Sequence, residues 1–107
     1  ASPLGESGFH ERVEQVMAAI EAQLEACDDL DCEINGGILT IEFADGGKVI
    51  VNRQAPNREI WVAAKSGGFH FRFDGAGWID TRSGEPLAAL LSRVVSTQAG
   101  TAIAITI

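Results

Sequence analysis

The sequence has no apolar run that approaches the roughly 18 residues of a bilayer-spanning helix. Its first residues also lack the basic segment followed by an apolar one that marks a secretory signal. We therefore expect neither a membrane span nor a secretory signal. With 107 residues and an apolar content of 46%, the chain has the size and composition of one globular domain, residues 1–107.

Cysteine is scarce, and the two cysteines present form no known motif. Cys27 and Cys32 lie five positions apart, which matches neither a C-x-x-C redox pair nor a zinc ribbon. We interpret them as two reduced thiols of a protein from a reducing compartment.

Basic residues are almost absent from positions 1–45, where eleven acidic residues stand against one base, Arg12. Positions 46–107 contain four acidic and seven basic residues, and the formal net charge of the chain is −7. Such an acidic field repels nucleic acid and anionic membranes, and it favours cations or a basic protein partner. We therefore expect no nucleic-acid partner and no membrane partner.

Motifs for catalysis are also missing. The sequence contains no G-x-S-x-G, no glycine-rich phosphate loop and no evident Ser–His–Asp or Cys–His set. The glycine pairs at 36–37, 46–47 and 67–68 are typical of turns instead. The sequence thus favours a binding protein over an enzyme, and it assigns no catalytic residue.

Apolar periodicity predicts a helix, a run of strands and a second helix. From residue 9 to residue 27 apolar residues recur mostly at spacings of three and four, which is typical of one face of an α-helix. Alternation then predicts strands at 31–35, 38–43, 48–52, 59–64, 69–73 and 78–79, separated by short turns. A second helical stripe runs from Leu87 to Val95, and the alternating tail, residues 101–107, is expected to pack against the domain.

Neither helix can bury its apolar stripe alone. We therefore predict an α+β fold, a two-layer α/β sandwich in which both terminal helices pack on one face of a five- to six-stranded antiparallel sheet. The other sheet face is left to solvent. The pattern does not decide whether Val49 and Val51 or Ile50 face the core; if Ile60 and Val62 do, alternation places Trp61 on the open face.

The main functional feature is a concentration of carboxylates. On the first helix they fall within an arc of roughly 100° beside the apolar stripe. They continue into the first strand, and the set is Glu11, Glu14, Glu21, Glu25, Asp28, Asp29, Asp31 and Glu33. A charge run is usually a solvated face, but an ordinary solvated face mixes both signs of charge. A solvated face and a binding surface therefore both stay open.

If these carboxylates bind metal, their oxygens suit hard cations such as Ca²⁺, Mg²⁺, Mn²⁺ or ferric iron and would hold ferrous iron weakly. The sequence has no EF-hand loop, no H-E-x-x-H and no two-His, one-carboxylate set, so binding would be shallow and poorly selective. His10 lies one turn before Glu14 and could add a nitrogen ligand, although a terminal histidine is more often solvated.

A second feature is Trp61, which follows arginines and amides at 52–58. Tryptophan with arginine and amides is the composition of interface hot spots. Tryptophan is also usually largely buried in cores. The sequence leaves both interpretations open.

Read as a whole, the chain resembles the frataxin family, and especially its bacterial members, from Phe9 to Gly100. The resemblance rests on an ordered set of segments: residues 31–37, 39–40, 50–56, 60–61, 66–71 and Trp78. It implies a sandwich of two helices on an antiparallel sheet, iron binding by an acidic ridge, and binding to the cysteine desulfurase and the scaffold protein of iron–sulfur cluster assembly. In bacterial members the effect resembles an iron-dependent brake on cluster synthesis, and in eukaryotic members an activator.

Carried over by position, the resemblance implies two sets of site residues. The ridge positions are Glu21, Glu25, Asp29, Asp31 and Glu33, to which we add Glu14, Asp28 and His10 as candidate metal ligands. The positions on the partner-binding sheet surface are Asn52, Gln54 and Trp61, and we add His70 from a matching segment. The ridge is thinner than in some relatives, because Ala22, Ala26 and Cys27 stand where those often have acids or an aromatic residue.

Our leading hypothesis is a monomeric, cytoplasmic regulator of iron–sulfur cluster assembly that weakly binds iron (Fe²⁺ or Fe³⁺) and can accept other divalent cations. The mitochondrial matrix is the alternative location. Two alternative functions stay open, a metal-indifferent acidic interaction domain and a weak iron oxidase.

Overall fold

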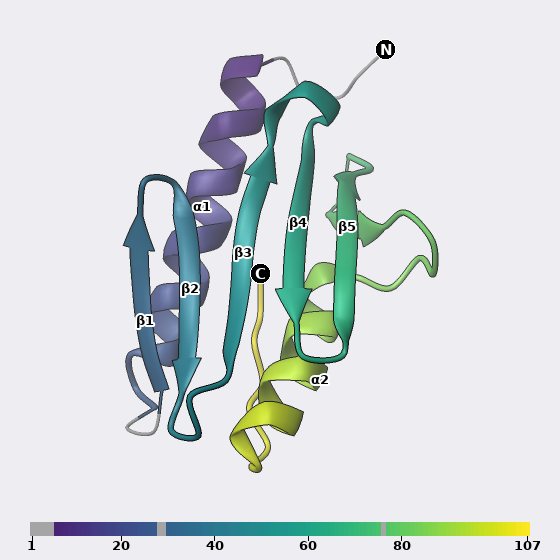
Figure 1. Ribbon diagram of the computed structural model, residues 1–107. Helices are drawn as coiled ribbons and strands as arrows, with labels where there is room; N and C mark the ends of the chain where they lie inside the picture. The colour runs from purple at the N-terminus through teal and green to yellow at the C-terminus, as the bar shows by residue number, and fades with distance from the viewer. Residues whose placement is uncertain (1–5, 28–29, 76) are drawn as a thin grey trace.

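The computed structural model describes residues 6–27, 30–75 and 77–107. It contains, in chain order, α1 (Glu6–Leu24), β1 (Leu30–Asn35), β2 (Ile38–Phe43), β3 (Lys48–Gln54), the 3₁₀ turn η1 (Ala55–Asn57), β4 (Glu59–Ala64), β5 (Gly67–Phe73), β6 (Trp78–Asp80) and α2 (Leu87–Ala99). The strands form one antiparallel sheet in sequential order, β1 to β6, so each short turn joins direct neighbours (Figure 1). No helix in the described residues is long and apolar enough to cross a bilayer.

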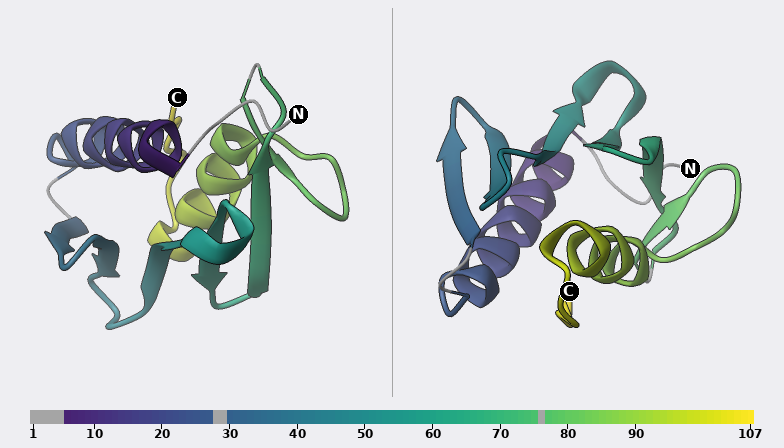
Figure 2. Two further views of the ribbon diagram at one scale, coloured as in Figure 1. Left: turned by 90° about the horizontal axis from the view of Figure 1, so that it is seen from above. Right: turned by 60° about the horizontal axis from the view of Figure 1, so that its bottom comes forward.

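Both helices lie on the same side of the sheet (Figure 2). The core between the layers takes one face of each helix and alternate residues of the strands, among them Leu39, Ile41, Val49, Val51, Ile60, Val62 and Phe71. The predicted two-layer sandwich with an antiparallel sheet is therefore confirmed.

The orientation of β3 and β4, which the pattern left undecided, is set by this packing. Val49 and Val51 are fully buried, whereas Ile50 is 36% exposed. Ile60 and Val62 are also buried, so alternation turns Trp61 to the open face of the sheet. The conditional prediction for Trp61 is confirmed.

Helix α1 ends three residues earlier than its apolar stripe predicts. The stripe continued to Cys27, but the helix stops at Leu24, and the Cys27 amide donates to the Leu24 carbonyl at 2.9 Å in a tighter turn. Cys27 still packs against the core from this turn. Cys27 lies three residues after Leu24, a spacing that occurs both along a helical stripe and in a chain that turns back at a helix end. The sequence pattern could not separate the two, which explains the error.

Strand β5 begins two residues earlier than predicted. The glycine pair was expected to form a turn, but Gly67 and Gly68 are the first residues of the strand, opposite Ala64 and Ala63. Gly67 has a φ of +140°, a conformation that residues with a Cβ rarely adopt. The turn therefore consists of two residues, and this sets the register of all later pairs of β4 with β5.

The C-terminal tail packs against the domain as expected, although it forms no strand. Ile105 is buried, and the tail is held to α2 by the hydroxyls of Ser92 and Ser96. Thr106 also exchanges hydrogen bonds with Gln23 on α1. The tail therefore connects the two helices.

Candidate functional site

Four of the predicted metal ligands lie where α1 ends and edge strand β1 begins. We call the described members Glu21, Glu25, Asp31 and Glu33 the acidic ridge. Glu21 is half-buried in the last turn of the helix, and the other three are exposed. The predicted ligands Asp28 and Asp29 lie outside the described residues.

Helix α1 packs beside β1, and the carboxylates of both elements act on the thiol of Cys32. Burial raises the pKa of Cys32 to about 11, and the charges of Glu21, Asp31 and Glu25 add to this effect, as does Cys27. Negative charge near a thiol disfavours the thiolate. Two carboxylates from the end of α1 thus raise the pKa of a residue on β1. The acidic residues of the helix and the strand therefore contribute to one negative field.

Strand pairing extends this field onto the open face of the sheet. Asp31 lies opposite Glu42 of β2, a residue that sequence reasoning did not assign to the site. Lys48 contacts the Glu42 carboxylate at 3.6 Å, with both side chains about half exposed, so this pair is weak. In an antiparallel hairpin, residues pair outward from the turn. The turn at residues 36–37 would therefore have predicted that Asp31 lies opposite Glu42.

The single base of α1 does not neutralise the ridge. The Arg12 guanidinium lies over the ring of Phe73 on β5, 4.6 Å from its centroid. Strand β1 forms one edge of the sheet, four strands away from β5. The ridge therefore keeps its negative charge and can attract a cation or a basic protein surface.

The donor set fits weak binding of hard cations. All four ridge side chains offer carboxylate oxygens, which Mg²⁺, Ca²⁺ and iron accept. Within the described residues, however, no three His, Cys, Asp or Glu side chains converge to hold one ion. Such a surface can collect exchangeable ions, but it does not form a cage.

The predicted ligands His10 and Glu14 lie apart from the ridge. Arg53 Nη1 lies 3.0 Å from His10 Nδ1. Because a guanidinium only donates, Nδ1 accepts, and the proton of the neutral ring is on Nε2. Metal binding by either nitrogen would therefore require this arrangement to change. Glu14 is exposed seven residues before Glu21, or roughly 10 Å along the helix.

The predicted partner-binding residues lie in two adjacent rows across the open face. Asn52 on β3 pairs with Trp61 on β4, and Trp61 pairs with His70 on β5. The structure thus brings these three together. Gln54 belongs to the next row, opposite Glu59, which in turn pairs with Arg72.

Trp61 is held in place by its neighbours. Its ring stacks on His70, with centroids 4.3 Å apart and planes 8° from parallel. Its Nε1 donates to Glu59 Oε1 at 2.9 Å. Sequence reasoning missed Glu59, although alternation along β4 places residues 59 and 61 on the same face.

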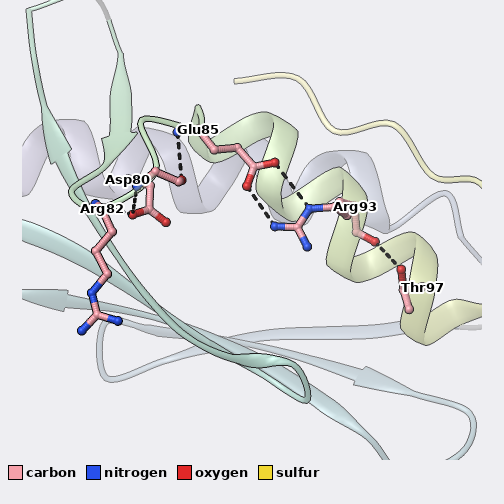
Figure 3. A network of polar contacts seen from close by, with 6 residues as sticks. Asp80, Arg82, Glu85, Arg93 and Thr97 are labelled. Carbon is pink, nitrogen blue, oxygen red and sulfur yellow. Dashed lines mark hydrogen bonds and ion pairs between the residues drawn. The ribbon is translucent and has the colours of Figure 1, made fainter.

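A separate polar network fixes the connection from β6 to α2 (Figure 3). Asp80 is buried and accepts the Arg82 amide at 2.7 Å, while Arg93 on α2 donates to Glu85 at 2.9 Å. The hydrogen bond that Arg93 donates to Glu85 raises the pKa of Arg93. The side chain of Arg82 points away from this network (Figure 3). These contacts order a loop beside His70, and we assign them a structural role.

Residues 2–101 match the family model described as a Frataxin-like domain. The chain belongs to the frataxin family. A curated relative, the iron–sulfur cluster assembly protein CyaY of Dechloromonas aromatica (strain RCB), is 56% identical over 102 residues, covering 94% of this chain and 97% of the relative. The protein of the same name from Cupriavidus metallidurans is 54% identical over 104 residues, covering 92% and 93%.

Solved frataxin structures share the fold. The frataxin from Psychromonas ingrahamii has a TM-score of 0.89 at 32% identity, covering 97% of this chain and all of that chain. Trimeric frataxin from the yeast Saccharomyces cerevisiae, in a ferrous complex, has a TM-score of 0.70 at 27% identity, covering 92% and 88%. The predicted family is confirmed, while the monomeric state of this frataxin stays a prediction.

Proposed function

We propose that this chain binds iron weakly and regulates iron–sulfur cluster assembly by docking on the cysteine desulfurase and on the scaffold protein. The observation that carries the proposal is that the end of α1, with Glu21 and Glu25, packs beside edge strand β1, with Asp31, because this joins helix and strand carboxylates into one negative patch. The effect of these three charges on the pKa of Cys32 supports it. Relatives named for iron–sulfur cluster assembly support the process, and the ferrous complex of yeast frataxin supports the metal. The bacterial sources of the relatives support a cytoplasmic location.

The acidic ridge serves two ligands in this proposal. Exposed carboxylates bind iron weakly enough for exchange, and the same charges attract a basic patch on the desulfurase. Exposed charges are screened beyond roughly 8 Å at physiological ionic strength. Desulfurase affinity should therefore fall steadily as salt is raised, and an affinity that stays constant would contradict the electrostatic part.

The open sheet face serves the scaffold protein. Trp61 is the anchor, because a half-exposed aromatic ring among amides has the features of an interface hot spot. Trp61→Ala should weaken scaffold binding by roughly 30-fold, the equivalent of a 2 kcal/mol hot spot. Lys65→Ala, in the exposed β4–β5 turn, is the control and should bind normally. Equal binding by both variants would exclude Trp61 as the anchor.

The deciding experiment is an NMR titration of labelled protein with Fe²⁺ under anaerobic conditions, followed by purified desulfurase. Both additions should shift or remove the signals of Glu21, Glu25 and 31–33. Shifts from the desulfurase alone would leave an acidic interaction domain and overturn the iron part. The absence of shifts from the desulfurase would overturn the docking part.

A charge-matched pair of variants separates the ridge from overall charge. Glu21→Gln with Glu25→Gln should remove the iron-dependent shifts. Glu11→Gln with Asp45→Asn removes the same charge from other exposed positions and should retain them. Asn at position 45 keeps the oxygen that accepts the Gly47 amide at 2.8 Å. Equal losses in both double variants would show a response to net charge instead of a ridge site.

A further inference from the structure

We propose that Glu59 is a positioning residue, which holds the Trp61 indole in one orientation before the scaffold protein binds. This inference rests on the proposed function of the open sheet face. Glu59 carries no direct partner contact in the proposal and acts through Trp61.

Glu59 is buried on a face of the sheet that is otherwise open. Its side chain is 8% exposed, whereas the side chains of Arg72, opposite it on β5, and His70, in the neighbouring row, are 65% and 45% exposed. The neighbours of Glu59 therefore cover it. Burying a carboxylate costs free energy unless it is paired and hydrogen-bonded. This position therefore suits a carboxylate only because strong donors surround it.

Both carboxylate oxygens of Glu59 have such a donor. Oε1 accepts the Trp61 Nε1–H at 2.9 Å, and Oε2 accepts Arg72 Nη2 at 2.8 Å. His70 Nδ1 lies 3.9 Å from Oε1. An indole nitrogen can only donate, and a charged acceptor gives it a stronger hydrogen bond than a neutral one. Arg72 fixes the carboxylate, and the carboxylate fixes the edge of the indole.

The indole is thus held in two directions. Glu59 holds its edge, and the His70 ring, 4.3 Å away and 8° from parallel, covers one face. A side chain that is already ordered loses less conformational entropy on binding. Without this arrangement, scaffold binding would itself have to immobilise the Trp61 side chain. We therefore expect its loss to weaken scaffold binding by roughly 3- to 10-fold.

The test compares Glu59→Met with Glu59→Gln. Methionine fills similar space but removes the acceptor, whereas glutamine keeps a neutral oxygen for the indole. The chain has two tryptophans, so the indole region of a ¹⁵N spectrum contains two signals, and buried Trp78 serves as an internal reference for folding. We expect Glu59→Met to shift the Trp61 Nε1–H signal and lower its heteronuclear NOE, with Trp78 unchanged, and to weaken scaffold binding 3- to 10-fold.

Glu59→Gln should restore most of the signal position and most of the affinity. Glu11→Met is the control, because it makes the same substitution at an exposed position of α1, on the helix side of the sheet. It should leave the Trp61 signal and scaffold binding unchanged.

Three results are distinguishable. If the Trp61 signal and its NOE are the same in Glu59→Met and wild type, the positioning role is wrong. If the signal moves but the affinity does not, Glu59 orders the indole without serving binding, which also overturns the inference. If wild-type protein does not bind the scaffold, the proposed function itself fails, and the NMR comparison still decides whether Glu59 orders Trp61.

Discussion

Arg53 on β3 donates from Nη1 to Nδ1 of His10 on α1 at 3.0 Å, and this contact joins the start of the helix to the end of the strand. Within the described residues, the buried Nε of Arg53 has no hydrogen-bond partner. His10 is therefore an important acceptor for a partly buried guanidinium. This relationship gives His10 a structural role, whether or not it also binds metal.

We expect His10→Ala to destabilise the fold by about 1–3 kcal/mol, because it leaves part of a charged, half-buried group without its acceptor. Urea denaturation followed by circular dichroism measures this free energy. Glu11→Ala, at the exposed neighbouring position, should change stability by no more than about 0.5 kcal/mol. Equal effects of the two substitutions would show that helix propensity, and not the contact with Arg53, determines the loss.

The element order and the layers could be predicted from the sequence because they depend on local period. Leu39 and Ile41 alternate with polar residues, and this pattern alone indicates which side of β2 is buried. In β3 the apolar residues Val49, Ile50 and Val51 are consecutive and therefore fall on both faces, so Ile50 and Val51 could not be assigned until the helices covered one side. Packing decided what periodicity could not.

The details of the site were less predictable because they depend on register. The pair Gly67–Gly68 is typical of a turn, yet both residues lie in β5, and the pairing of Trp61 with His70 follows from that shift. Glu59 has no sequence motif, and its role depends on Arg72, thirteen positions away. The convergence of helix and strand acids likewise required the chain reversal after Leu24.

The same substitution, isoleucine to alanine, should have different effects on stability at a buried position of β2 and at an exposed position of β3. Ile41 is fully buried, so Ile41→Ala should cost about 2–5 kcal/mol through lost burial and a cavity. Ile50 is 36% exposed on the open face, and Ile50→Ala should cost less than about 1 kcal/mol. Chemical denaturation of both variants tests the assignment of the two faces, and a reversed order would contradict the packing described above.

The tail should depend on the Ser96 hydroxyl. Ser96 Oγ donates to the Ile103 carbonyl at 2.9 Å and accepts the Ile103 amide at 2.8 Å, so Ser96→Ala leaves two backbone groups of the tail unpaired. We expect a loss of about 1–3 kcal/mol and faster hydrogen exchange of the Ile103 amide. Thr97→Ala removes only an exposed bond to the Arg93 carbonyl at 2.9 Å (Figure 3). It should not accelerate exchange at Ile103, and similar exchange in both variants would contradict the role of Ser96.

The thiol of Cys32 should report the charge of the ridge. In a Cys27→Ser background Cys32 is the only thiol. The contribution of Cys27 is lost there, but burial and the carboxylates still raise the pKa of Cys32 and should make alkylation by iodoacetamide slow at pH 8 to 9. Replacing Glu21 and Glu25 with Gln removes two charges that disfavour the thiolate, so the pKa should fall and alkylation should accelerate. Glu11→Gln with Asp45→Asn should not change the rate, and an equal acceleration there would refute a local field.

The same pKa also predicts how stability depends on pH. In the unfolded chain a cysteine thiol has a pKa near 8.5, so between roughly pH 8.5 and 11 the unfolded state binds fewer protons at Cys32 than the folded state. The contribution of Cys32 to stability is therefore fully present below this range and is lost as the pH rises through it. Urea denaturation at pH 8, 9 and 10 should show a steeper loss for the parent than for Cys32→Ala. The chain has no tyrosine that would ionise in this range, so parallel pH profiles of the two proteins would mean that the folded state does not hold this thiol protonated.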